Sequence, residues 1–208
     1  MSKAGKTLIS FNVKNGQYAI GAGAPKPLSF LATFAKEKNI DSKAIYGDGE
    51  MQVTVYNDKG MTGTMTLTGR DNEYGIDLGF AKILSGGGIA EIQQIKSTEH
   101  AIYFETYDMV KELTSEEFMQ TTAKVWVFGV TTSAPSETLS QNTDSINENS
   151  VDYAITMKGV KLKDSTGLVN YRDVNGNEFN VFTYKKLPGD TGYATFGDAE
   201  PVPKEPVA

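Results

Sequence analysis

The residue types that could do chemistry in this 208-residue chain are carboxylates, a single histidine and a few ligand-like loops. Two carboxylates can work as a general acid and a general base when folding brings them together. Five acidic residues lie close in sequence: Asp48, Glu50, Asp71, Glu73 and Asp77. Each of them also fits a turn, a helix cap or a solvated surface. The spacing therefore does not indicate a catalytic pair.

The single histidine, His100, lies just before a stretch of aromatic and β-branched residues at 101–107. One histidine cannot build a histidine-based metal site, and no serine stands beside it in a nucleophile motif. We expect His100 to have a structural role.

Three segments look like ligand-binding loops but lack the spacing that such loops require. The glycines at 21–24 and 86–88 are not followed by Gly-Lys-Ser/Thr, nor do they form a Gly-x-Gly-x-x-Gly turn between a strand and a helix. The segment 173–178 resembles a calcium loop without its acidic spacing, and an Asn-Gly hairpin turn explains it more simply. We therefore expect no cofactor, no metal and no enzyme activity.

Composition narrows the class of protein further. The formal net charge is −6 and the longest basic run is Lys185-Lys186, so the chain lacks the clustered cations that grip nucleic acid. It has no cysteine, which excludes disulfides and thiol chemistry. No apolar run reaches the roughly 20 residues that span a membrane, and the N-terminus lacks a hydrophobic signal core. We expect a protein made and kept in a cytoplasm, or assembled there into something larger.

Alternating residues predict a hairpin at 50–69. Hydrophobic residues at 51, 53 and 55 alternate with polar ones, and the Asn-Asp-Lys-Gly sequence at 57–60 is typical of a turn. The return strand places threonines 62, 64, 66 and 68 on one face, which suits water or a wet lumen. Residues 70–86 then change to helical spacing, with Asp71 or Asn72 as the N-cap.

The central stretch of the chain pairs a fully apolar strand with an alternating one. Residues 125–130, which include the only tryptophan, predict a strand covered on both faces. Residues 151–157 alternate, and the inward set shifts by one position at Gly159, which predicts a β-bulge there. Between the two strands lies a polar link at 131–150.

These patterns predict a mainly β fold: an antiparallel β-sandwich or barrel with one flanking α-helix and long loop or arm extensions. We expect one β-domain at 1–187, with arms near 31–49 and 131–150, and an extended C-terminal tail at 188–208. Long irregular connections are uncommon in compact domains and usually serve in binding or ordering. Three such appendages suggest a subunit that reaches its neighbours in an assembly.

Two segments resemble the major tail proteins of long-tailed bacteriophages of Gram-positive hosts. The first is the apolar strand at 125–130, continued by Thr-Thr-Ser-Ala-Pro-Ser-Glu-Thr and, after a polar stretch, by the alternating strand within 147–157. The second is Ala-Ile-Tyr-Gly-Asp-Gly-Glu at 44–50, followed by Gly-Met-Thr-Gly-Thr-Met-Thr-Leu at 60–67 and the helix before Ile83. Together they cover most of 44–162. The segment 108–122 is longer than the family pattern.

The resemblance implies a tail tube protein of the virion, assembled in the cytoplasm of a host bacterium. Six copies would form each ring, and stacked rings would form a hollow tube through which genome DNA passes without specific binding. Partners would be further copies and other tail proteins, namely the tape measure, distal tail and terminator proteins, with no membrane involved. An acidic lumen would repel phosphate and keep DNA mobile.

Candidate functional residues follow from this hypothesis. We expect Asp48, Glu50 and Asp58 to face the lumen. The intersubunit arm candidates are Ser136, Glu137, Asp144 and Glu148.

Two alternatives stay open. One is a carbohydrate- or receptor-binding β-sandwich module on a virion or cell surface, which should show exposed aromatic residues in its loops or a calcium site. The other is the tube protein of a related contractile injection machine.

Overall fold

The computed structural model describes residues 6–21, 23–48, 50–93, 98–112, 117–137, 150–160, 162–164, 167–169, 171–173 and 175–201. These residues form fifteen strands and one short helix. The strands of the main sheet are β1 (Lys6–Ala19), β2 (Lys26–Pro27), β3 (Leu31–Gly47), β4 (Glu50–Leu67), β7 (His100–Glu112), β8 (Phe118–Thr132), β9 (Ser136–Glu137), β10 (Val151–Met157) and β15 (Thr183–Lys186). The small ribbons are β5 (Ala81–Ile83) with β6 (Ile89–Glu91), β11 (Leu162–Asp164) with β12 (Gly167–Val169), and β13 (Tyr171–Arg172) with β14 (Glu178–Phe179).

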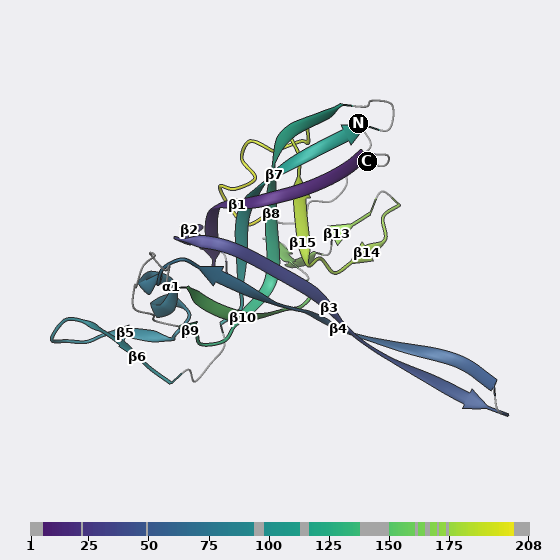
Figure 1. Ribbon diagram of the computed structural model, residues 1–208, viewed down its shortest axis with the longest axis horizontal. Coiled ribbons are helices and arrows are strands. Elements are labelled where there is room, and N and C mark those ends of the chain that lie inside the picture. The colour runs from purple at the N-terminus through teal and green to yellow at the C-terminus, as the bar shows by residue number, and fades with distance from the viewer. Residues whose placement is uncertain are drawn as a thin grey trace, which may run out of the picture.

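The main sheet is antiparallel and runs in the order β2-β1-β7-β8-β10-β4-β3, with β15 also paired to β8 and β9 to β10 (Figure 1). Strand β1, next to the short end strand β2, approaches β3 at the other end of this order. The amide of Leu28 donates to the carbonyl of Gly16 at 2.8 Å in this region. The sheet therefore curls toward a barrel, and the predicted mainly β class with one short helix is confirmed.

Strand β8 is covered on both faces, as its sequence predicts. Val125, Val127 and Val130 pack inside the curl, while Trp126 and Phe128 pack in a second cluster on the outer face. All five side chains are buried. Strand β8 thus contributes to both hydrophobic cores, which explains why its apolar residues are consecutive.

Strand β10 confirms the predicted alternation, because Val151, Tyr153, Ile155 and Met157 are buried and the residues between them are exposed. The bulge predicted at Gly159 is wrong. Instead β10 ends at Met157, and Val160 joins the outer cluster through a bridge to Val181.

A single short helix, α1 (Asn72–Asp77), closes the inner core. Asp71 is its N-cap and accepts from the amide of Tyr74, so the predicted cap is confirmed. The predicted length of 70–86 is wrong. Gly79 adopts a φ of 81°, which ends the helical path, and β5 follows.

The C-terminal segment 188–201 folds into turns, so the prediction of an extended tail is wrong for these residues. Phe196 is buried in the outer cluster, and Tyr193 donates its hydroxyl to the carbonyl of Thr122 at 2.7 Å. The tail's last residues, 202–208, lie outside the described part of the chain.

The predicted hairpin at 50–69 is also wrong. The sequence at 57–60 does not turn, because β4 continues through it and pairs with β3 along its whole length. The residues predicted as an irregular arm near 31–49 therefore form a strand. The turn signal at 57–60 becomes a bulge instead, where Gly60 adopts a φ of 96°.

Candidate assembly interface

The β3–β4 hairpin leaves the barrel and extends well beyond it (Figure 1). Its root, at 61–67, is paired on both sides because β10 pairs with β4 there. Toward the tip, from Glu50 to Asp58, β4 pairs with β3 and with no other strand among the described residues. Residues 40–58 therefore form a projecting two-stranded ribbon, named here the ribbon.

The ribbon carries large apolar side chains that water reaches. Tyr46 is 69% exposed and Tyr56 is 71% exposed. Five more are 44–60% exposed: Ile40, Ile45, Met51, Val53 and Val55. Scattered apolar residues on a surface need no explanation, but a continuous group on one projecting element is typical of an interaction site.

Strand register places these side chains on both faces of the ribbon. Ile45 lies opposite Val53, and two pairs further along Lys43 lies opposite Val55 on the same face. Tyr56, opposite Ser42, lies on the other face. After a one-residue irregularity, Tyr46 lies opposite Met51. An isolated two-stranded ribbon is marginally stable in water and gains stability when a partner covers it.

The three lumen candidates lie at different places on this hairpin. Asp48 and Glu50 stand at its tip, where Asp48 adopts a φ of 53°, and both are exposed. Asp58 lies near the root, opposite Ile40, and accepts a hydrogen bond from the amide of Gly60 at 2.9 Å. The structure thus brings Asp48 and Glu50 together and leaves Asp58 apart from them. A lumen-facing role for these residues stays a prediction.

The arm candidates are divided in the same way. Ser136 and Glu137 form β9, which pairs with Asp152 and Val151 of β10 in the same chain, and both side chains are exposed. Asp144 and Glu148 lie outside the described residues. A contact of any of the four with another copy stays a prediction.

A polar cluster that the sequence analysis missed lies where β1, β3, β7 and β15 meet. Lys185 places its ammonium 2.5 Å from a carboxylate oxygen of Asp108, which is fully buried. Lys185 also donates to the hydroxyl of Ser10 at 2.9 Å. Lys36, on β3, donates to the hydroxyl of Thr183 at 2.6 Å. No sequence signal joins these residues, because they come from four separate strands.

Lys36 differs from Lys185 in its surroundings. Among the described residues no carboxylate lies within ion-pair distance of Lys36, and part of its side chain reaches solvent. The protein around its ammonium lowers the pKa of Lys36, and the neighbouring Lys185 ammonium adds to this effect. Two ammonium groups and one carboxylate leave an excess positive charge at this point.

His100 belongs to a buried polar network, which bears out its expected structural role. Its Nδ1 lies 3.1 Å from the carbonyl of Thr98, and this acceptor assigns the proton to Nδ1. Its Nε2 then accepts from the hydroxyl of Tyr74 at 2.9 Å, and Tyr74 also contacts the hydroxyl of Thr132 at 3.1 Å. Burial lowers the pKa of His100 to about 4.

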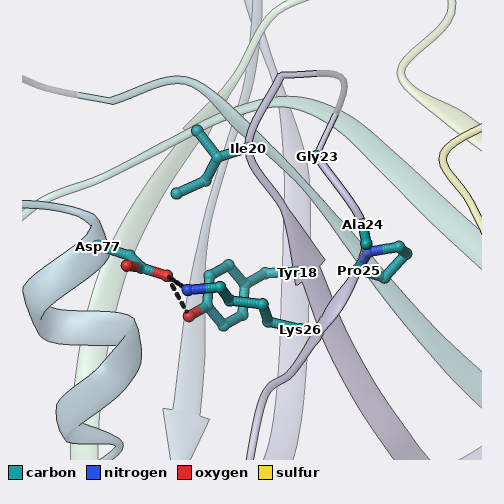
Figure 2. A pocket seen from close by; sticks show the side chains of 7 residues that line it. All are labelled: Tyr18, Ile20, Gly23, Ala24, Pro25, Lys26 and Asp77. Atoms are coloured by element: carbon teal, nitrogen blue, oxygen red, sulfur yellow. Dashed lines mark hydrogen bonds and ion pairs between the residues drawn. The ribbon is translucent and has the colours of Figure 1, made fainter.

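A shallow cavity of about 410 Å³ lies between α1 and the segment that joins β1 to β2 (Figure 2). At its base, Tyr18 and Lys26 each donate a hydrogen bond to the same oxygen of Asp77, at 2.7 Å. Partial burial alone would raise the pKa of Asp77, but these two donors lower it. These hydrogen bonds join α1 to β1 and β2, and the three polar groups satisfy one another.

The other carboxylates of the first candidate set also have structural roles or lie apart. Asp71 caps α1, while Glu73 forms an ion pair with Lys26 at 3.1 Å. Within the described ranges, no group of three or more histidine, aspartate or glutamate side chains could hold a metal ion. The same part of the chain contains no helix long and apolar enough to cross a membrane.

The chain matches no model of a known protein family, and no curated protein is significantly similar to it.

Proposed function

We propose that this chain is a structural subunit of a bacteriophage tail tube, in which copies assemble into stacked hexameric rings around a channel for genome DNA. The observation that carries the proposal is the ribbon at 40–58, which presents apolar side chains on both faces and open strand edges. Such a surface is suited to a second copy of the chain, because symmetric assemblies cover exposed edges by pairing them between subunits.

The fold supports the proposal in two ways. A mainly β body with one short helix is what the resemblance to major tail proteins implies. The helix and the two hydrophobic cores hold the body together without the ribbon, so the ribbon is available for contacts outside the chain. The acidic net charge suits a channel through which DNA passes without binding to the wall.

Assembly is tested by sedimentation of the purified protein over a series of concentrations. The triple variant Ile45→Thr, Val53→Thr and Val55→Thr keeps β-branched side chains but removes apolar surface from the ribbon. Each methylene-sized group that is no longer buried at the interface costs about 0.8 kcal/mol. We therefore expect the variant to need at least about tenfold more protein to assemble. A variant that assembles as readily as the wild type would contradict the proposal.

The matched control lies on another exposed ribbon. Ile83 and Ile89 are cross-strand partners on β5 and β6, and they are 69% and 47% exposed. Ile83→Thr with Ile89→Thr should leave the concentration dependence unchanged. A wild-type protein that stays monomeric and binds carbohydrate would favour the receptor-binding alternative.

A further inference from the structure

The two ends of the hairpin carry opposite charge. Asp48 and Glu50 stand at the tip, and neither has an ion-pair partner among the described residues. Lys36 and Lys38 stand at the root on the same face of β3, with Lys185 beside Lys36. The tip therefore offers two carboxylates, and the root offers ammonium groups of which Asp108 neutralises one.

The tip cannot reach the root of its own chain. From Lys36 to Gly47, strand β3 is extended and pairs with β4, with two register shifts along the way. At about 3.3 Å per strand residue, this separation is roughly 40 Å. A contact between the tip carboxylates and Lys36 is thus possible between copies and excluded within one copy.

We propose that the acidic tip of one copy, Asp48 and Glu50, binds the lysine cluster at the hairpin root of the next copy, with Lys36 as the receiving cation. The inference rests on the proposed tube function and specifies its contact. Thr183 holds the Lys36 ammonium in place through a hydrogen bond, and the fully buried Asp108 holds Lys185. The root cations are therefore positioned before the partner arrives.

Such a contact is head to tail, because different surfaces of the two copies meet. Head-to-tail contacts that do not close on themselves continue into open filaments. If the tip of every copy binds the next root, the axial repeat of the assembly follows the length of the ribbon, at roughly 40 Å. The apolar faces of the ribbon would then lie against the body of the neighbour and supply most of the stability, while the charges fix the register.

The absence of cysteine gives a direct test. Lys36→Cys and Glu50→Cys are made as separate proteins, mixed in equal amounts under assembly conditions and oxidised gently. A disulfide needs the two Cα atoms within about 7 Å, so it reports a close contact between copies. We expect the disulfide between Lys36→Cys and Glu50→Cys to form at least about tenfold faster than the disulfide between Lys36→Cys and Asn57→Cys. Asn57 lies in the ribbon but away from its tip.

Charge exchange is the second measurement. Glu50→Lys and Lys36→Glu should each raise the concentration needed for assembly about tenfold, and the double variant should recover most of the loss. Glu50 is chosen over Asp48 because the positive φ of Asp48 would strain a lysine there. Glu37→Lys, on the opposite face of β3, is the control and should have little effect.

The outcomes separate this inference from the proposed function. Assembly of the wild type with no preference for the Lys36–Glu50 disulfide and no recovery in the double variant would overturn the contact and leave the tube proposal standing. A wild-type protein that never assembles at any concentration would overturn both.

Discussion

The indole N–H of Trp126 donates a hydrogen bond to the backbone carbonyl of Phe196 at 2.6 Å. Both residues are buried in the outer core, and the ring of Phe196 packs edge-on against Tyr184 with centroids 4.9 Å apart. This bond joins the central strand β8 to the C-terminal segment. It fixes the segment as part of the body of the protein.

Trp126→Phe should lower the free energy of unfolding by about 1–3 kcal/mol. The shorter ring leaves the Phe196 carbonyl buried without its donor and leaves space in the outer core. Urea denaturation of the monomer measures the loss. Thr195→Ala, an exposed change in the same turn, should be neutral, and equal stabilities for the two variants would contradict this role of the hydrogen bond.

Stability should fall with acid because of His100. Its folded-state pKa is about 4 against an ordinary value of 6.5, so the unfolded chain binds the proton more readily. The stabilisation is fully present above pH 6.5 and is lost as the pH falls toward 4, by about 3 kcal/mol.

Denaturation curves between pH 7.5 and about 4 measure this effect. His100→Asn removes the titrating group and should flatten that part of the profile, even if the variant is less stable at neutral pH. An unchanged slope in the variant would show that His100 is not the cause.

Gly60→Ala should disturb the root of the hairpin. Gly60 has a φ of 96°, and a Cβ there would lie 2.4 Å from the carbonyl oxygen of Met157. We expect a loss of more than about 2 kcal/mol in the free energy of unfolding, from backbone strain and the clash together. Gly86→Ala, where a Cβ meets open space and φ is not positive, is the control and should change little.

Amide hydrogen exchange should show whether the ribbon becomes covered on assembly. In dilute protein the amides at 40–58 should exchange early, because this ribbon has few buried apolar contacts. On assembly they should become protected, whereas the amides of β10 should be protected in both states. Exchange of the ribbon that does not change with concentration would argue against its role as an interface.

Local patterns predicted the parts of the fold that one strand can determine alone. The run around Trp126 indicated burial on two faces, and the alternation from Val151 indicated one buried face, because side-chain direction follows directly from strand geometry. The cap at Asp71 was equally local.

The errors came from pairing between segments. The Asn-Asp-Lys-Gly sequence at 57–60 is a turn signal by itself, yet pairing with residues 31–47 makes it a bulge in a continuous strand. The polar composition of the tail predicts an extended segment, but the carbonyl of Phe196 binds the indole of Trp126, which is far away in sequence. The lysine cluster around Lys36 also depends on four strands meeting, and no spacing in the sequence encodes it.

Electron microscopy of the concentrated, purified protein in negative stain is the strongest test of the proposed tail tube. We expect rings with six-fold symmetry and hollow tubes built from them, which the threonine variant of the ribbon should not form under the same conditions. Single particles the size of one chain at every concentration, or tubes that form equally well from that variant, would contradict it.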